Sequence, residues 1–462
     1  MKKNHDTSSG RRTFLKAAAG FMGSTLFGGV PFRAFAQATE LKAAERCFVF
    51  VYFSGGWDQL LAFDPKDPDI FTPDRVSETR ILPGYSFTDP RFPSRPLLPA
   101  KRAGAAESNI TFGPAVGESL AAHYDLMTVV RGINMTTLAH EEGMRYFITG
   151  KRPIGAAARG SSTATEVVGQ MKPTVPLPSI AYNVESYNEG YPGAANALKV
   201  NKASDLLLTL SPSTTQLDSE LEGQLLDFRG EPISCEAAAY GAGGVGTTYA
   251  TSRGQMKQVI SNGLDKAFRF ELGENEAVRK AYGLGNAGPY DNAAGRAALV
   301  ATALKKGISQ CVSINLAGGL DTHFGTQTSH ALNQRTGFDA LAMLVNDLRS
   351  TPHWAGGNFM DHTTVLVYSE FARTPLMNAA SGRDHHLTNS CLLMGAGLKH
   401  NTVFGRSGDI AMAPAVVNLR TGESDPLNGQ NILPEHIIAT VLASAKLDYS
   451  ITRVEPLHSL LT

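Results

Sequence analysis

Histidines and acidic residues that adjoin apolar runs are concentrated between residues 311 and 397. Seven of the twelve histidines lie between positions 323 and 400, far more than an even distribution along 462 residues would place there. Carboxylate oxygen and neutral imidazole nitrogen are ligands that Zn²⁺, Mn²⁺ and related divalent cations accept. The pattern therefore predicts a metal site. The candidate ligands in this stretch are Asp321, His323, Glu370, Asp384, His385 and His386.

These residues adjoin short runs rich in Val, Ile and Leu, at residues 311–316, 363–368 and 390–395. Such runs, separated by helical stretches, are typical of the buried parallel strands of an α/β sheet. Residues just past the carboxyl ends of these strands converge on one crevice. Acids and imidazoles gathered there are costly to remove from water unless a cation compensates them.

An earlier strand supplies a further acid to the same edge of the sheet. The apolar run 47–53 continues into Ser-Gly55-Gly56-Trp-Asp58. The two glycines let the backbone turn sharply, which presents Asp58 beside the later acids. An aspartate in this place also suits a turn or a helix cap. Beside the downstream cluster, we interpret it as a metal ligand.

A strand at 126–131 leads through Thr136 and Thr137 to a helix that begins at His140 and ends near residue 149. The start of a helix after a strand is a place where a nucleophile or an anion meets free backbone amides. We expect His140 to line the site, as a ligand or a base, although it also suits a plain helix start. Thr137 is a candidate catalytic residue, whereas His330 is expected at the surface or in a cap.

The remaining pattern predicts one α/β domain over residues 37–462, with irregular insertions at 64–112 and 183–250 and a further strand at 177–182. The glycine-rich stretch 241–246 is interpreted as a linker, since no strand precedes it and no phosphate-loop lysine follows. Helices are predicted at 114–124, 163–171, 253–282, 292–306, 330–349 and 434–443.

Residues 1–36 resemble a twin-arginine signal peptide. Arg11-Arg12 precedes a short, glycine-broken apolar stretch, and small residues before Gln37 suit cleavage by a signal peptidase. A membrane anchor would need about 20 solidly apolar residues, so we expect no membrane span in the mature chain. The predicted partner is the twin-arginine export machinery, and the predicted location is periplasmic or secreted.

Composition narrows the function classes. After position 36 the chain holds 36 basic and 41 acidic residues without a basic patch, so we expect no nucleic-acid partner. Its four cysteines, Cys47, Cys235, Cys311 and Cys391, form no Cys-x-x-Cys pair. Most of them lie in or beside predicted strands, and we expect buried free thiols rather than a disulfide.

Taken in order, the motifs resemble the DUF1501 family of exported twin-arginine proteins, a branch of the alkaline phosphatase and sulfatase superfamily. Gln59 and His386 stand where family members usually have Gly, which leaves open whether His385 or His386 binds a metal. The motifs that carry the resemblance are Gly-Gly-Trp-Asp58, Asp321-Thr-His323, Ser-Glu370-Phe-Ala-Arg373-Thr, Arg-Asp384-His385 and Met-Gly-Ala-Gly397.

The resemblance implies an alkaline-phosphatase-like fold, a three-layer α/β/α sandwich with a mostly parallel central sheet and two metal ions at the strand ends. By similarity, Asp58 and Glu370 serve one cation. Asp321, His323 and His385 serve the other. The identity of the cation stays open among Zn, Mn, Mg and Ca.

Arg373 is then a candidate catalytic contact, because its planar fork matches a phosphate or sulfate group. A salt bridge to a nearby acid is the alternative. The chain has neither the Cys-x-Pro-x-Arg signature that yields formylglycine in sulfatases nor the Asp-Ser-Ala stretch of alkaline phosphatase. The resemblance thus leaves the nucleophile unassigned.

The leading hypothesis is an exported metal-dependent hydrolase of phosphate or sulfate esters, acting on a small-molecule or glycan substrate. The missing nucleophile keeps an alternative open, a non-catalytic extracytoplasmic binding or assembly protein that retains the fold and a structural metal. A nicotinamide or flavin enzyme is disfavoured, because no glycine-rich dinucleotide fingerprint follows the first strand.

Overall fold

The computed structural model describes residues 44–211, 251–252, 254–255, 258–259, 263–325 and 327–462. The chain divides into two compact units, and the larger comprises Leu41–Ala203 and Phe270–Thr462. The described part of the smaller unit contains most of α6 (Ala203–Leu210) and all of α10 (Asp265–Phe268). The predicted signal peptide and Cys235 lie outside the described residues. Every candidate site residue lies in the larger unit.

An eight-stranded sheet forms the centre of the larger unit, with the strand order β10-β2-β9-β6-β1-β5-β3-β4. Its middle strands are buried along their whole length, as expected of a sheet that is covered on both faces. A separate two-stranded sheet pairs β7 (Ala372–Arg373) with β8 (His385–His386). The strands of the large sheet are β1 (Cys47–Phe53), β2 (Met127–Asn134), β3 (Leu177–Tyr182), β4 (Leu198–Val200), β5 (Ser309–Ala317), β6 (Thr363–Tyr368), β9 (Thr388–Gly395) and β10 (Thr402–Phe404).

The direction of β9 decides which residues reach the functional edge. β9 pairs antiparallel with both β2 and β6, whereas the other pairs of the large sheet are parallel. The beginning of β9 therefore lies at the same edge as the carboxyl ends of β1, β2, β5 and β6. This arrangement brings the segment before β9, rather than the segment after it, to the site.

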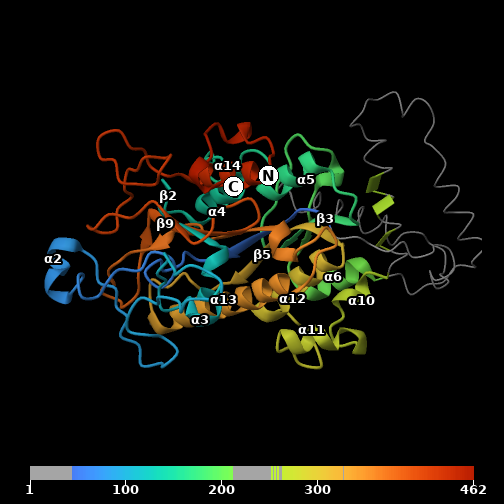
Figure 1. The fold of residues 1–462 in the computed structure, drawn as a ribbon, viewed down its shortest axis with the longest axis horizontal. Coiled ribbons are helices and arrows are strands. Elements are labelled where there is room, and N and C mark those ends of the chain that lie inside the picture. Colours follow the sequence, from blue (N-terminus) through green and yellow to red (C-terminus); the bar gives the residue numbers. More distant parts are fainter. Residues whose placement is uncertain (1–43, 212–250, 253, 256–257, 260–262, 326) are drawn as a thin grey trace, which may run out of the picture. The chain divides into compact units, whose positions relative to one another are not determined.

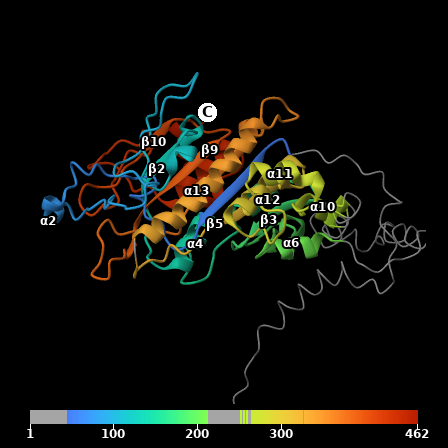
Figure 2. The same cartoon turned by 90° about the horizontal axis from the view of Figure 1, so that it is seen from below.

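Helices cover both faces of the sheet, and Figures 1 and 2 show the layers. α3 (Gly117–Ala121), α12 (Ala293–Lys305) and α13 (Gln327–Ser350) lie on one face. α4 (His140–Thr149), α5 (Thr163–Met171) and α14 (Pro434–Ser444) lie on the other. The unit is thus a three-layer α/β/α sandwich, as predicted.

Successive side chains of β1 point to opposite faces of the sheet, so this strand packs against both helical layers. Phe53 packs on Phe338 of α13, with ring centroids 4.7 Å apart. Its neighbour Tyr52 points to the opposite face and stacks on Tyr368, which in turn stacks on Phe147 of α4. A strand with apolar side chains on both faces is stable only between two helical layers.

Most elements match the sequence-based expectations, but β4 and α6 were not predicted and one predicted helix is wrong. The predicted bounds of β1, β3, β6 and α5 are those observed. The predicted helix at 253–282 is wrong, because its described part is broken into α10, a 3-10 turn at Gly273–Asn275 and α11 (Glu276–Ala281). The chain passes from one compact unit to the other after Arg269, whose ψ of 77° is not helical. A single helix cannot continue through that point.

No helix among the described residues is both long enough and apolar enough to cross a bilayer. The longest, α13, contains 24 residues and carries polar side chains along its length. The predicted free thiols are confirmed for three of the four cysteines. Cys47, Cys311 and Cys391 are buried and unpaired, and burial raises the pKa of Cys47 to about 12.

Candidate functional site

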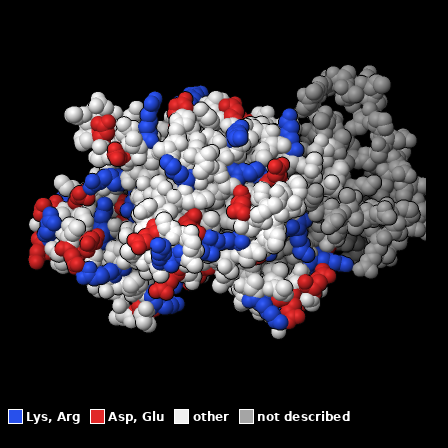
Figure 3. Space-filling view, in the orientation of Figure 1, with Lys and Arg blue, Asp and Glu red and all other residues white. Residues whose placement is uncertain are grey.

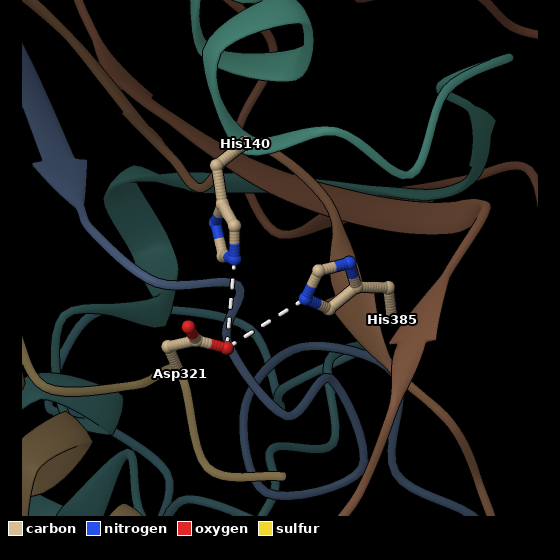
Figure 4. Close-up of side chains that lie close together, drawn as sticks. All are labelled: His140, Asp321 and His385. Atoms are coloured by element: carbon tan, nitrogen blue, oxygen red, sulfur yellow. Dashed lines mark ion pairs between the residues drawn. The ribbon is translucent and has the colours of Figure 1, made fainter.

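Three histidines surround one carboxylate oxygen at the functional edge of the sheet. The Nε2 atoms of His140, His323 and His385 lie 3.5, 3.2 and 3.6 Å from Oδ1 of Asp321. Figure 4 shows two of these imidazoles, from separate segments, pointing toward Asp321. We call these four residues the histidine cluster. Among the described residues, the group of three whose ligand atoms all lie within 4.8 Å of one another is His140, Asp321 and His385.

The other ring nitrogen of each histidine is already engaged. Nδ1 of His140 lies 2.8 Å from Glu370 Oε1, and Nδ1 of His323 lies 2.8 Å from Asp384 Oδ1. Nδ1 of His385 lies 2.6 Å from the carbonyl oxygen of Leu138. Because all three partners are acceptors, the proton of each neutral imidazole sits on Nδ1. The Nε2 lone pairs then point to the centre, the arrangement found in carboxylate–histidine–metal sites.

Hydrogen bonds do not explain two features of the histidine cluster. The buried Nε2 of His140 has no hydrogen-bond partner among the described residues. The Nε2 atoms of His323 and His385 approach each other to 2.8 Å. Two lone pairs cannot share that distance without a proton or a cation, and a buried unsatisfied nitrogen costs about 1–3 kcal/mol. A cation among these nitrogens resolves both features.

The charges around the cluster favour ionised acids and a neutral His385. Burial acts to raise the pKa of Glu370, but hydrogen bonds from His140, Ser369 and Gly55 outweigh it and leave the pKa lowered. The hydrogen bond to Glu370 raises the pKa of His140. Burial lowers the pKa of His385.

The acids beside His323 follow the same pattern. The hydrogen bond from His323 lowers the pKa of Asp384. Burial acts to raise the pKa of Asp321, but the hydrogen bond and charge of Arg373 reverse the direction and lower it. Ionised carboxylates next to imidazoles form a donor set suited to a divalent cation.

Arg373 fixes the position of Asp321 through an ion pair. Its side chain is fully buried, and Nη2 donates to Asp321 Oδ1 over 2.7 Å. The remaining donors reach the carbonyl oxygens of Gly55, Gly56 and Arg383. These contacts match the salt-bridge alternative raised for this arginine.

Close backbone packing brings the segments of the site together. Gly55 has a φ of +111°, and a Cβ placed on it would lie 2.6 Å from the backbone nitrogen of Asp321. The positive φ and the absent side chain let the turn after β1 lie directly against the turn after β5. Gly143 does the same for α4, since a Cβ there would lie 2.3 Å from the carbonyl oxygen of Glu370.

Asp58 lies in a second, closed group at this edge. Its Oδ1 accepts a hydrogen bond from the backbone of Leu60, and its Oδ2 forms a buried ion pair with Nε of Arg383 at 3.1 Å. The backbone amide of Asp58 donates to Nε2 of His330 at 2.9 Å. We call Asp58, Arg383 and His330 the buried Asp58 group. Among the described residues, no hydrogen bond or ion pair joins the Asp58 carboxylate or the His330 imidazole to the histidine cluster.

Two other candidates also have partners of their own. The hydroxyl of Thr137 donates to Glu142 at 2.8 Å and accepts from the amide of Ala139, so it organises the start of α4. Nε2 of His386 lies 2.9 Å from the carbonyl oxygen of Ala411, and burial lowers its pKa. Of the adjacent pair at 385 and 386, His385 is the one that reaches the cluster.

The structure adds residues that the sequence did not single out. His330 was expected at the surface or in a cap; it is 3% exposed, and its Nδ1 lies 2.7 Å from Thr322 Oγ1. Arg383 was noticed only as part of its motif. His330 lies at helical spacing from Gln334, Phe338 and Leu341, which are buried on the same face of α13, and this spacing was the signal that could have indicated its burial.

Comparisons with solved structures give distant likenesses. One is described as "Crystal structure of Ps i-CgsB in complex with k-i-k-neocarrahexaose"; it is 8% identical, has a TM-score of 0.34, and the alignment covers 89% of this chain and 75% of that one. A second, from a study of glycosaminoglycan metabolism by Bacteroides thetaiotaomicron, is 8% identical with a TM-score of 0.31 and covers 89% and 76%. Both are too distant to support an argument. A search of curated proteins found no match.

A family profile matches most of the chain. The profile described as "Protein of unknown function (DUF1501)" matches residues 44–421. That range contains the eight-stranded sheet, the whole histidine cluster and the buried Asp58 group. The chain therefore belongs to the DUF1501 family.

Proposed function

We propose that this protein is an exported hydrolase of phosphate or sulfate esters that depends on one divalent cation. The observation that carries the proposal is the convergence of three Nε2 atoms on one carboxylate oxygen while every Nδ1 is held by an acceptor. Side chains with a purely structural role at the edge of a sheet normally pair their polar atoms with each other, and these nitrogens do not. The proposed ligands are His140, Asp321, His323 and His385.

The residues present fit a cation of the zinc or manganese type. Three imidazole nitrogens and one carboxylate oxygen are a common donor set for these ions. In this proposal Glu370 and Asp384 orient ligands instead of binding the cation, and Asp58 stays outside the site. The proposal thus has one cation where the resemblance implied two.

The chain's own residues prepare the site for an ester group. When bound, a divalent cation here supplies Lewis acidity toward a phosphoryl or sulfuryl oxygen and lowers the pKa of water. Glu370 and Asp384 keep the Nδ1 protons in place, and Arg373 holds Asp321. The Asp321 side chain is 54% exposed, so a substrate reaches the centre from solvent.

The rim of the site offers apolar contacts for the rest of a substrate. Leu138, whose carbonyl holds His385, is 45% exposed, and Phe324, next to His323, is 83% exposed. Exposed apolar side chains beside a polar centre are typical of a ligand-binding edge. A sugar ring or an aromatic leaving group suits these two side chains.

Attack by water fits the site better than attack by a side chain. The Thr137 hydroxyl contacts Glu142 and the amide of Ala139, and no contact between it and the histidine cluster is found among the described residues. The same observation favours the second candidate function, a non-catalytic binding or assembly protein with a structural cation. For either function we retain export through the twin-arginine route and a periplasmic or secreted location, on the strength of Arg11-Arg12.

Metal content and ester hydrolysis test the proposal together. The protein is equilibrated with Zn²⁺, Mn²⁺, Mg²⁺ or Ca²⁺, desalted, analysed by mass spectrometry for metals, and assayed with p-nitrophenyl phosphate and p-nitrophenyl sulfate. We expect about one bound cation and turnover of at least one ester. His323→Ala and His385→Ala lose both, whereas the matched variant His386→Ala keeps both.

The outcomes separate the two functions. A protein that binds the cation through the cluster but leaves a broad panel of esters intact is the binding protein, and the hydrolase proposal fails. Unchanged metal content in His323→Ala and His385→Ala removes the cluster from either function.

A further inference from the structure

A cavity lies at the end of α4 that is far from the histidine cluster. It has a volume of about 610 Å³ and is open to solvent. His140 forms the first residue of α4, and the cavity begins at Gly150, the residue that caps its last turn. Ten helical residues at 1.5 Å each span about 15 Å. The cavity is therefore separate from the proposed ester site.

Four cationic side chains line this cavity, and we call it the basic pocket. They come from two segments that are far apart in the sequence. None of the four forms an ion pair with a described residue, although their charges lie in one pocket. The four are Lys151, Arg152, Arg159 and Arg453.

The two acids of the basic pocket are already occupied. Oε2 of Glu189 accepts a hydrogen bond from the backbone amide of Gly160 at 2.6 Å. Oε2 of Glu435 accepts one from the hydroxyl of Tyr146 at 2.5 Å, and the charge of Arg152 acts on the same carboxylate. Four cations against two carboxylates leave the pocket with an excess of two positive charges.

Lys151 lies against the backbone of the pocket, whereas the side chains of Arg152, Arg159 and Arg453 are exposed. The side chain of Lys151 lies across Gly160, where an added Cβ would be 2.5 Å from Nζ. On the face shown in Figure 3, basic and acidic side chains are mixed.

We infer that the basic pocket binds a small organic anion that carries two or more phosphate or sulfate groups. Each arginine fork can donate two hydrogen bonds to the oxygens of such a group, and Lys151 adds a mobile point charge. The volume is within the range of small-molecule sites and suits a ligand of disaccharide or nucleotide size. The inference does not depend on the ester hydrolase proposal, since the pocket lies outside the histidine cluster.

Calorimetric titration of the purified protein tests this inference. The probes are inorganic pyrophosphate for the phosphate class and a disulfated disaccharide for the sulfate class, with the unsulfated disaccharide as the neutral control. We expect saturable binding of a charged probe that weakens as salt is added. Loss of a charged hydrogen bond is worth about 1.5–3 kcal/mol, so Arg159→Ala and Arg453→Ala each weaken binding about tenfold or more.

Controls keep the result specific. Arg420→Ala removes an exposed arginine outside the pocket and leaves the affinity unchanged. His323→Ala also binds the anion normally, which separates this result from any failure of the ester site. The probe that binds more tightly shows whether the basic pocket prefers phosphate or sulfate groups. Absence of saturable binding with both probes, or wild-type affinity in an Arg159→Ala/Arg453→Ala double variant, overturns the inference.

Discussion

The histidine cluster and the buried Asp58 group are built from the same residue types at the same edge of the sheet. Asp321 pairs with Arg373 at 2.7 Å, and Asp58 pairs with Arg383 at 3.1 Å. The Asp321 side chain is 54% exposed, whereas that of Asp58 is 2% exposed. Each aspartate follows a strand and lies beside a histidine, yet only one of the two is accessible to a ligand.

The histidine cluster and the buried Asp58 group differ in how their polar atoms are paired. Both nitrogens of His330 have partners, one in Thr322 and one in the amide of Asp58. Nε2 of His140 forms no hydrogen bond among the described residues and has only the Asp321 oxygen, 3.5 Å away. In the buried Asp58 group, Oδ2 of Asp58 and Nε of Arg383 also form no hydrogen bond, but they compensate each other's charge at 3.1 Å. Residue type therefore does not identify a metal site. Unsatisfied ligand atoms that point to a common centre do.

The largest effect is expected when the buried Asp58 group is broken. Arg383→Ala leaves the Asp58 carboxylate buried without its cation, which typically costs about 3–5 kcal/mol. Urea unfolding measures the loss. Arg406→Ala, at the exposed Arg406–Asp409 pair, is the matched control and changes stability by about 0–1 kcal/mol. Equal effects of the two substitutions would contradict the structural role that we assign to the buried pair.

Removal of the cation should affect the histidine cluster alone. A cation at about 100 times its dissociation constant stabilises the fold by about 2.7 kcal/mol. We expect a chelator to lower the thermal midpoint of the wild type and of His330→Gln by similar amounts. His140→Ala should show no chelator effect. A chelator effect that survives in His140→Ala would place the cation elsewhere.

Acid should affect the buried Asp58 group through His330. Burial lowers the pKa of His330 from 6.5 to about 3. The folded protein keeps this imidazole neutral, so its contribution is complete above pH 6.5 and is lost as the pH falls from 6.5 toward 3. The slope is at most about 1.4 kcal/mol per pH unit. Unfolding of His330→Gln across this window should show a shallower pH dependence, and parallel curves would contradict it.

The sequence predicted the fold better than it predicted the site. Long apolar runs identify β1, β3 and β6 because a strand buried on both faces has to be apolar throughout. The rule that strand ends converge also placed Asp321 and His385 at one edge, where the structure brings them together. The run 390–395 was interpreted as a parallel strand, which is wrong, because β9 pairs antiparallel with both of its neighbours. An apolar pattern is the same in either direction and could not show this.

The sequence could not distinguish free ligand atoms from occupied ones. Asp58 and Asp321 follow similar strands, and only their partners, Arg383 in one case and a group of imidazoles in the other, separate them. Those partners come from distant segments. The metal roles of Glu370 and Asp384 stay predictions, although both carboxylates already hold the Nδ1 atom of a histidine.

The reversed direction of β9 also has a consequence for the order of folding. The connection from β6 to β9 stays at one edge, so Arg373 and the carbonyl of Arg383 meet across 10 residues. Asp384 and His323 are 61 residues apart, and His140 and Glu370 are 230 apart. Closing longer loops costs more entropy and slows folding. We expect the chain to assemble the local half of this edge first and to complete it last with the arrival of α4.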